Sequence, residues 1–231
     1  MRSGTWGERD ALLPQGHLQT RNLVRQRGRW ITAALLVLTA SCSRTPGSDL
    51  ARGRTLFNNC ARCHGALGGG SRALRAPAIA GLPRWYVQAQ LEKFRGAHRG
   101  YAPFDTTGIR MKSMAWTIHS DADLASLATY VSALTPAKPA PVLGGDAQAG
   151  QAAYQVCQAC HGPDAMGNEA LHAPPLALAS DWYLLAQLQK FKAGWRGTDT
   201  ADIWGMTMRP NAMMLDDAGM ANVVAYIQSR R

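Results

Sequence analysis

The chain has 231 residues, enough for one or two domains, and its hydrophobic content of 46% is ordinary for a globular protein. Its formal net charge of +10 is unevenly placed, since residues 1–41 carry +4 and residues 42–231 carry +6. The apolar stretch at residues 30–40 is too short to cross a bilayer as a helix, which excludes a spanning helix made of these residues alone.

The N-terminal segment has the layout of a secretory export signal. A basic run, the apolar stretch and several small residues precede Cys42. The ending "LTASC" resembles a bacterial lipoprotein signal, in which the cysteine is lipidated and becomes the new N-terminus. We therefore predict an export signal at residues 1–41, lipidation of Cys42 and a tether at residues 42–49. Simple cleavage after Ser41 and an uncleaved anchor are the alternatives.

A Cys-x-x-Cys-His motif occurs twice, at Cys60, Cys63 and His64 and again at Cys157, Cys160 and His161. Two thiols one helical turn apart can form thioethers to the two vinyl groups of one porphyrin, and the adjacent imidazole then falls under the iron. The motifs therefore predict two covalently bound haem c groups. A redox dithiol needs no histidine there. The cysteine pairs of a zinc site usually lie about 15–20 residues apart, whereas 93 residues separate Cys63 from Cys157.

An internal repeat organises the rest of the chain. A shift of 97 residues superposes both motifs and many further positions, and the shift falls to 96 after residue 118. Superposed pairs include Gly53 with Gly150, Pro77 with Pro174, Trp85 with Trp182, Phe94 with Phe191 and Arg99 with Arg196. This predicts two copies of one domain, at residues 50–135 and 147–231. The prolines of residues 136–146 favour an extended, semi-rigid linker between them.

Each copy is predicted to be helical. A short helix precedes each haem motif, and residues 83–97 and 180–194 form a second pair of helices. The C-terminal helix of each copy shows one apolar face, with Ser120 as the N-cap in the first copy and Asp216 in the second. No run shows the alternation typical of a strand.

Each iron needs a second axial ligand, for which methionine is the typical choice in electron transfer. The repeat selects Met111 and Met208, because these two methionines superpose. Met114, Met206 and Met213 have no methionine at the paired position, although Met114 stays open as a replacement for Met111. Filling of the core is the commoner use of methionine. His98, His119 and His172 are rival ligands without a paired histidine, so a surface or capping role is favoured for them.

The order of these features resembles class I cytochrome c: the Cys-x-x-Cys-His motif, a loop proline, an aromatic-led helix, a methionine loop and a C-terminal helix with a tyrosine. Two such units in tandem resemble the periplasmic di-haem cytochromes c that feed bacterial terminal oxidases. The resemblance covers about residues 50–231. It implies an all-α fold of two tandem class I cytochrome c domains, each a few helices wrapped around one covalent haem.

The resemblance also implies residue roles. It assigns the iron ligands to His64 and Met111 in the first copy and to His161 and Met208 in the second. The carbonyl groups of Pro77 and Pro174 would accept the N–H of the haem histidines, which orients each ring. The second copy departs from the pattern at Leu178, where a glycine often follows the proline loop and Gly81 supplies it in the first copy.

Six-coordinate irons leave no position for a substrate, which predicts an electron carrier rather than an enzyme. Its partners would be redox proteins, namely a quinol-oxidising complex as donor and a terminal oxidase or another reductase as acceptor, with no nucleic acid. It would lie on the periplasmic side of a bacterial membrane, held there by the lipid. A di-haem peroxidase-type enzyme with one open haem position and a haem-based sensor are the alternatives.

The two copies differ in charge. Residues 50–135 carry +7 and residues 147–231 carry −1. Four arginines close to the first haem motif in sequence, Arg62, Arg72, Arg75 and Arg84, would form a collar that steers an acidic redox partner. The alternative is an ordinary solvated surface, which is how most surface charge behaves.

Overall fold

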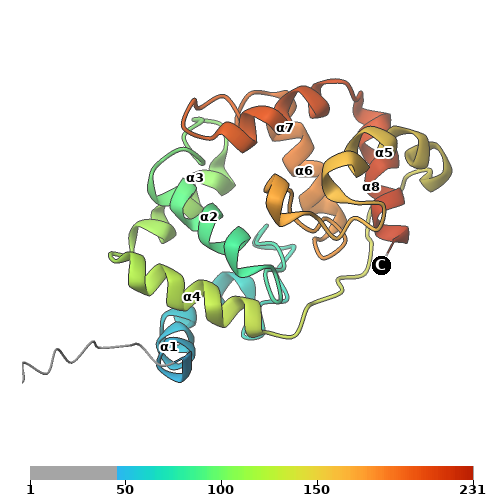
Figure 1. Cartoon of the computed structure of the whole chain (residues 1–231). Coiled ribbons are helices and arrows are strands. Elements are labelled where there is room, and N and C mark those ends of the chain that lie inside the picture. The colour runs from blue at the N-terminus through green and yellow to red at the C-terminus, as the bar shows by residue number, and fades with distance from the viewer. Residues whose placement is uncertain (1–45, 231) are drawn as a thin grey trace, which may run out of the picture. The chain divides into compact units, whose positions relative to one another are not determined.

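The computed structural model describes residues 46–230, and the two repeats fall within one compact unit (Figure 1). Over these residues the regular structure is helical, with only isolated β-bridges at Ser71–Ala76 and Asn168–Ala173. The prediction of an all-α fold is confirmed. The predicted export signal and Cys42 lie outside the described residues. No helix within residues 46–230 is both long and apolar enough to cross a membrane.

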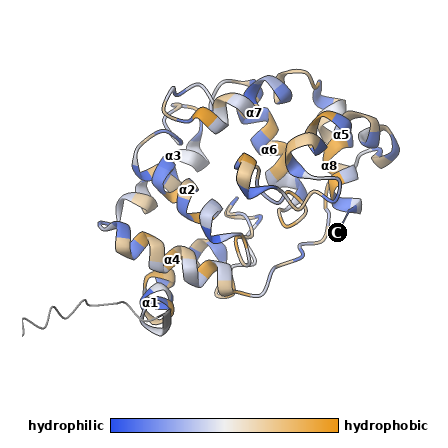
Figure 2. Cartoon of the chain, in the orientation of Figure 1, coloured by the Kyte–Doolittle hydropathy of each residue, from blue (hydrophilic) through white to orange (hydrophobic). Residues whose placement is uncertain are grey.

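The first repeat contains four helices. They are α1 (Pro46–His64), α2 (Arg84–Arg95), α3 (Thr106–Trp116) and α4 (Asp121–Ala133). Helix α1 packs along α4, and α2 contacts both α3 and α4. Apolar and polar residues are interspersed along these helices (Figure 2), and the apolar ones enclose a core around Phe57, Leu91 and Leu127.

The second repeat follows the same plan. Its elements are α5 (Ala147–His161), the 3₁₀ turn η1 (Glu169–Leu171), α6 (Asp181–Lys192), α7 (Ile203–Met213) and α8 (Asp217–Ser229). Helix α5 packs along α8, and α6 contacts both α7 and α8. A second core forms around Tyr154, Leu184 and Val223.

The ends of the C-terminal helices are where the sequence predicts them. The hydroxyl of Ser120 accepts the N–H of Asp123 at 3.0 Å, and the carboxylate of Asp216 accepts the N–H of Gly219 at 2.7 Å. The helices before the haem motifs are longer than predicted, because α1 and α5 continue through both cysteines to the histidine. Each motif is therefore presented from the last turns of a helix.

The methionine segments are helices rather than the loops that the resemblance implies. Helices α3 and α7 begin at Asp105 and Asp202, whose carboxylates accept the N–H groups of Gly108 and Gly205 at 2.8 and 2.9 Å. Neither helix shows the apolar periodicity that predicts a helix from sequence, since each buries only one glycine and one alanine and α7 contains Pro210. The buried aspartate caps stabilise the first turn of each helix instead.

A glycine permits the close crossing of helices in each repeat. A Cβ atom on Gly53 of α1 would lie 2.2 Å from the carbonyl oxygen of Ser126 in α4. A Cβ atom on Gly150 of α5 would lie 2.0 Å from the carbonyl oxygen of Asn222 in α8. Both neighbours are backbone atoms, so a side chain at either position has to separate the two helices.

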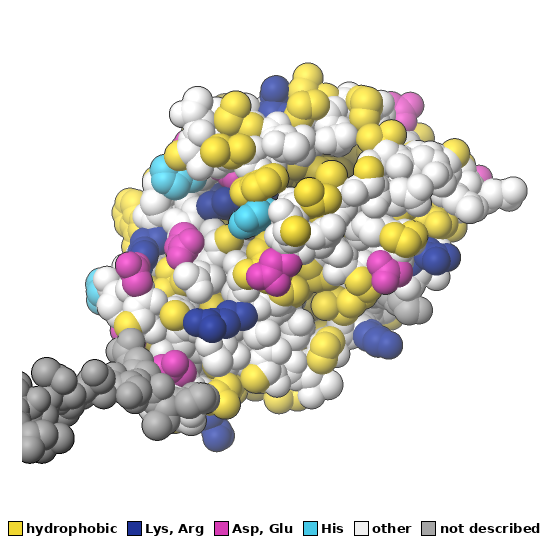
Figure 3. Space-filling model, in the orientation of Figure 1, with side chains coloured by type: hydrophobic (Ala, Val, Ile, Leu, Met, Phe, Trp, Pro, Cys, Tyr) yellow, Lys and Arg dark blue, Asp and Glu magenta, His cyan; other side chains and the backbone are white. Residues whose placement is uncertain are grey.

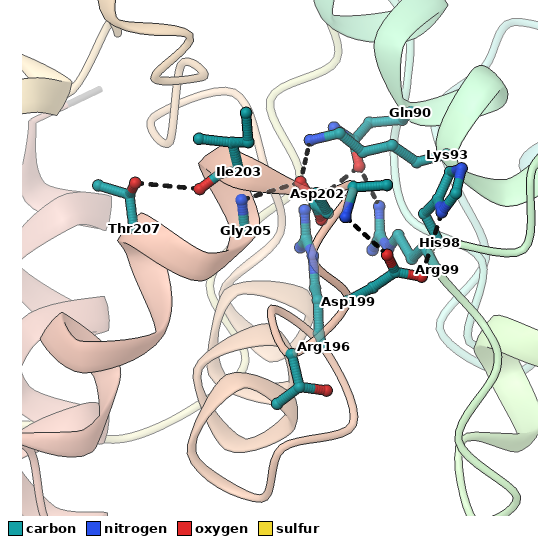
Figure 4. A network of polar contacts seen from close by, with 12 residues as sticks. Gln90, Lys93, His98, Arg99, Arg196, Asp199, Asp202, Ile203, Gly205 and Thr207 are labelled. Carbon is teal, nitrogen blue, oxygen red and sulfur yellow. Dashed lines mark hydrogen bonds and ion pairs between the residues drawn. The ribbon is translucent and has the colours of Figure 1, made fainter.

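Reciprocal ion pairs join the two repeats. Lys93 Nζ of α2 lies 2.6 Å from Asp202 Oδ1, and Lys190 Nζ of α6 lies 2.6 Å from Asp105 Oδ1. Lys93 and Lys190 are equivalent positions of the repeat, as are the two aspartates. Figure 4 shows Lys93 and Asp202 meeting between the repeats. The interface is thus built as in a twofold-symmetric dimer, although one chain supplies both halves.

We expect Gly53→Ala to lower the free energy of unfolding by roughly 1–3 kcal/mol, because the added methyl forces α1 away from α4. Urea unfolding followed by circular dichroism measures this. Gly47→Ala is the control on the same helix, where a Cβ would meet no atom within 4 Å. Its stability should be unchanged or slightly higher. An equal loss in both variants would contradict the crossing argument.

We expect Lys190→Met to destabilise the protein by roughly 3–5 kcal/mol at pH 7, because it leaves the buried Asp105 carboxylate unpaired. Burial raises the pKa of Asp105, but Lys190 and the Gly108 N–H outweigh it and hold that pKa below its ordinary value. The pair therefore stabilises the fold above the unfolded pKa of about 3.9, and its contribution is lost as the pH falls through the lower folded pKa.

Urea unfolding between pH 3 and pH 7 measures the difference between Lys190→Met and the parent protein. The deficit should shrink as the pH approaches 3, since a protonated Asp105 needs no cation. Lys138→Met, at an exposed position in the linker, is the control and should follow the parent at every pH. A deficit that does not change with pH would show that lost packing, not charge, is responsible.

Candidate functional site

One cavity of about 1390 Å³ is lined by both repeats, and we call it the shared cavity. Its wall includes all six residues of the two predicted haem motifs: Cys60, Cys63, His64, Cys157, Cys160 and His161. Figure 3 shows hydrophobic side chains gathered around a hollow on one face of the molecule. The structure thus brings each cysteine pair and its histidine to an apolar space of a size that suits a large planar ligand.

Each motif histidine is held by a proline carbonyl. His64 Nδ1 lies 2.7 Å from the carbonyl oxygen of Pro77, and His161 Nδ1 lies 2.9 Å from that of Pro174. A carbonyl can only accept a hydrogen bond, so Nδ1 carries the proton and Nε2 keeps a free lone pair. Burial lowers the pKa of both histidines, although the proline bond opposes it. Both rings are therefore neutral bases, as a metal ligand must be.

The cysteine environment argues against a redox dithiol. None of the four described cysteines forms a disulfide, and burial raises the pKa of the Cys60 thiol to about 11. Burial also raises the pKa of Cys157. Reactive dithiols need a lowered pKa, because the thiolate is the nucleophile. A protonated, half-buried thiol at a cavity wall is instead suited to thioether formation.

Three of the methionines within residues 46–230 line the shared cavity, namely Met111, Met114 and Met208. Met206 and Met213, which the repeat does not select, lie half-exposed outside it. The second repeat therefore offers one methionine to the cavity. The first offers two, one turn apart on α3, so Met114 stays open as an alternative to Met111.

Among the rival histidines, only His172 lines the cavity. It is the C-cap of η1, in the left-handed conformation with φ of 48°, and its ring stacks on Trp204 with centroids 4.5 Å apart. A capping role was predicted for this histidine, but its place at the cavity was not. The equivalent residue of the first repeat is Arg75, which also has a positive φ and lines the cavity.

The departure at Leu178 has a structural reason. Gly81 has φ of +72°, and a Cβ there would lie 2.4 Å from the Pro136 ring. Leu178 has no such conformation, and its side chain packs against the core of the first repeat. The second loop therefore follows a different path and contributes to the contact between the repeats.

Polar residues of α2 and α6, and of the segments that follow these helices, line the cavity where the repeats meet. Gln90, Lys93 and Arg99 come from the first repeat, and their equivalents Gln187, Lys190 and Arg196 come from the second. The buried Nε of Arg196 has no hydrogen-bond partner. Cationic groups and an unpaired donor at the wall suit a ligand that carries carboxylates, as haem does. The sequence did not predict that these six residues line a cavity, although the same three residue types occur at equivalent positions of both repeats.

Comparisons with known proteins agree with this geometry. The family model "Cytochrome c" matches the chain twice, at residues 50–135 and 147–231. A thiosulfate dehydrogenase electron acceptor from Thiomonas intermedia (strain K12) is 33% identical over 74% of this chain and 78% of its own length. Cytochrome c4 from Azotobacter vinelandii is 29% identical over 86% and 97%. The crystal structure of reduced cytochrome c4 from Pseudomonas stutzeri has a TM-score of 0.61 and 25% identity, covering 78% of this chain and 97% of that one.

Proposed function

Because this chain belongs to the cytochrome c family, as a tandem pair of domains that bind two haem c groups covalently, we propose that it carries single electrons between a respiratory donor complex and a terminal oxidase or other reductase. The observation that carries the proposal is that each repeat lines the shared cavity with a proline-bound histidine, whose Nε2 is free, and with a methionine.

Each residue has a defined role in this proposal. Cys60 and Cys63 hold the first haem and Cys157 and Cys160 the second, as thioethers. His64 and His161 offer Nε2 to the irons, and Pro77 and Pro174 fix the tautomer and direction of these rings. Met111 and Met208, which line the same cavity, would each hold an iron through the thioether sulfur. When bound, haem iron supplies one-electron chemistry, and a soft, neutral thioether raises its potential by favouring the ferrous state.

The methionines also weigh against a peroxidase-type enzyme. Such an enzyme needs one haem with an open position for peroxide. Each repeat has a methionine at the cavity wall, which supports a closed sixth position in both. An electron carrier needs no open position, only haem edges that partners can approach.

Two kinds of electron donor are candidates. A quinol-oxidising complex is the donor that the cytochrome resemblance implies. The Thiomonas relative is named as the electron acceptor of a thiosulfate dehydrogenase, so an enzyme of this kind is the second candidate donor. Electron exchange with each purified donor distinguishes the two.

We expect Met111→Ala and Met208→Ala each to remove half of the methionine-sulfur-to-ferric absorption band and to lower the potential of one haem. Each reduced variant should also gain carbon monoxide binding at one haem per chain. Met213→Ala, half-exposed and outside the cavity, should change neither property.

Met114→Ala decides between the two methionines of α3. It should leave the band intact if Met111 is the ligand. Stoichiometric carbon monoxide binding by the reduced parent protein would contradict the closed carrier and favour the peroxidase alternative.

The predicted arginine collar is exposed, and Arg72 and Arg75 line the shared cavity. We expect electron exchange with an acidic partner through the first haem to slow steeply with added salt, because screening acts over about 8–10 Å at physiological strength. The equivalents in the second repeat are Glu169 and His172, so exchange there should respond little.

Stopped-flow kinetics over a range of salt concentrations measures this. A variant with Arg72→Glu and Arg75→Glu should flatten the salt response without altering either haem spectrum. Arg54→Glu, an exposed position of α1 outside the cavity, is the charge-matched control for one reversal. Equal salt slopes for the double variant and the parent protein would remove the collar from the proposal.

We also propose that the protein lies on the periplasmic side of a bacterial membrane and is held there by a lipid on Cys42. A Cys42→Ser variant should then be released in the soluble fraction, because the lipid supplies the membrane affinity. Mass spectrometry of the mature N-terminus gives a second measurement. An unmodified or absent Cys42 in membrane-free wild-type protein would contradict the anchor.

A further inference from the structure

Two equivalent residues at the shared cavity differ in whether their charge depends on pH. Arg75 and His172 occupy the same position of the repeat, and both line the cavity. Both have a left-handed backbone, with φ of 51° and 48°. Arginine is a cation throughout the physiological range, whereas histidine is the side chain that ordinarily changes charge between about pH 5 and 8. The first repeat therefore places a permanent charge where the second places a titratable one.

The turns that carry these two residues are built alike. The N–H of Arg75 donates to the carbonyl oxygen of Arg72 at 3.0 Å, and the N–H of His172 donates to that of Glu169 at 2.9 Å. One β-bridge, between the residues that flank this bond, closes each turn. Since the backbone is the same, each position accepts the residue of the other repeat without strain.

Two tryptophans, one from each repeat, contact the ring of His172. The ring stacks on Trp204 of α7, with centroids 4.5 Å apart, and meets Trp85 of α2 edge-on at 5.8 Å. Trp204 also lines the cavity. Contact with an indole is favourable for a neutral aromatic ring and for a cation. The imidazole can therefore keep its place beside the cavity when its charge changes.

The other side chains of the cavity wall keep their charge between pH 5 and 8. Among residues 46–230 the lining contains no aspartate or glutamate. His64 and His161 are neutral rings bound to prolines, and the motif cysteines become thioethers in the haem-loaded protein. Lys93 and Lys190 form ion pairs with the buried aspartates, and the ordinary pKa values of lysine and tyrosine lie near 10.

The charged side chains in the turns around His172 do not titrate in this range either. They are Glu169 of η1, Arg84 in the first turn of α2 and Asp202 at the start of α7. Asp202 is paired with Lys93, and within the described part of the chain none of the three forms an ion pair with His172. Carboxylic acids ordinarily titrate near pH 4 and arginine above pH 12.

We propose that His172 is a proton-binding site coupled to the second haem, which binds a proton from solvent when that haem is reduced and releases it when the haem is oxidised. The inference rests on the proposed di-haem function. His172 belongs to the loop that runs from His161 to Pro174, so its charge lies on the side of the second haem.

The coupling follows from electrostatics. The electron comes from the donor protein and adds a negative charge at the iron, which raises the proton affinity of a nearby base. By linkage, the bound proton favours the ferrous state to the same extent. The reduced protein should therefore bind the proton several-fold more tightly than the oxidised protein. Arg75 is charged in both states, so the equivalent position of the first repeat provides no such coupling.

The first test is redox titration of the full-length, haem-loaded protein between pH 5 and 8. The shifted haem-methyl resonances in NMR report each haem separately. The potential of the second haem should fall as the pH rises, because loss of the proton removes a charge that favours the ferrous state. His172→Arg should hold that potential near its low-pH value over the whole range, and His172→Gln should hold it near its high-pH value.

The reciprocal variant is Arg75→His, which should give the first haem the pH dependence that His172→Arg removes from the second. His119→Arg is the matched control, since His119 is exposed and lies outside the cavity lining, and it should leave both pH profiles as in the parent protein. An unchanged slope at the second haem in His172→Arg would overturn the proton site. So would a first haem that does not respond to pH in Arg75→His.

The ring resonances of His172 give a direct measurement in the parent protein. Their titration midpoint should lie at higher pH in the ferrous than in the ferric state, and equal midpoints would contradict the coupling. The carrier function is tested separately by the pyridine haemochrome assay, which counts haem per chain, and by the methionine-sulfur band. Fewer than two haems, or no band, counts against the proposed function, whereas two haems, an intact band and equal midpoints count against the proton site alone.

Discussion

Each repeat of this structure depends on the same hydrogen bond, in which the Nδ1–H of the motif histidine donates to a proline carbonyl thirteen residues later. The bond ties the end of α1 or α5 to the following loop, so the last turn of each helix and the loop both line the shared cavity. It also selects the tautomer that leaves Nε2 free. Without this bond the two cysteines of each motif would still lie one helical turn apart, but the orientation of the imidazole ring toward the cavity would not be fixed.

The second organising feature is the charge between the repeats. Lys93 pairs with Asp202, and the equivalent Lys190 pairs with Asp105, so the interface contains the same ion pair twice, once from each side. Each lysine lies 2.6 Å from its aspartate, although the buried Asp202 Oδ2 accepts no hydrogen bond. Arg99 and Arg196 instead donate to glutamine oxygens, and both line the shared cavity. The helices α2 and α6 therefore both join the repeats and line the shared cavity.

The two repeats differ in the loops that follow the haem motifs, and residues of the second copy's loop contact the first repeat. Arg75 and His172 share a left-handed backbone conformation at the cavity, yet one is a cation and the other stacks on Trp204. Leu178 replaces a glycine and uses its side chain on the opposite core. The buried interface keeps its equivalent residues, because a change there removes a partner from a buried charge.

The sequence by itself determined the features that depend on local spacing. These are the two Cys-x-x-Cys-His motifs, the repeat, and the helices capped by Ser120 and Asp216. Local spacing could not predict α3 and α7, whose helical state depends on Asp105 and Asp202 being buried against lysines of the other repeat. Nor could it predict the arginine pair, because residues 99 and 196 are ordinary surface cations until α2 and α6 pack together. Only the tertiary structure buries them, to 5% and 8% exposure, because their surroundings come from both repeats.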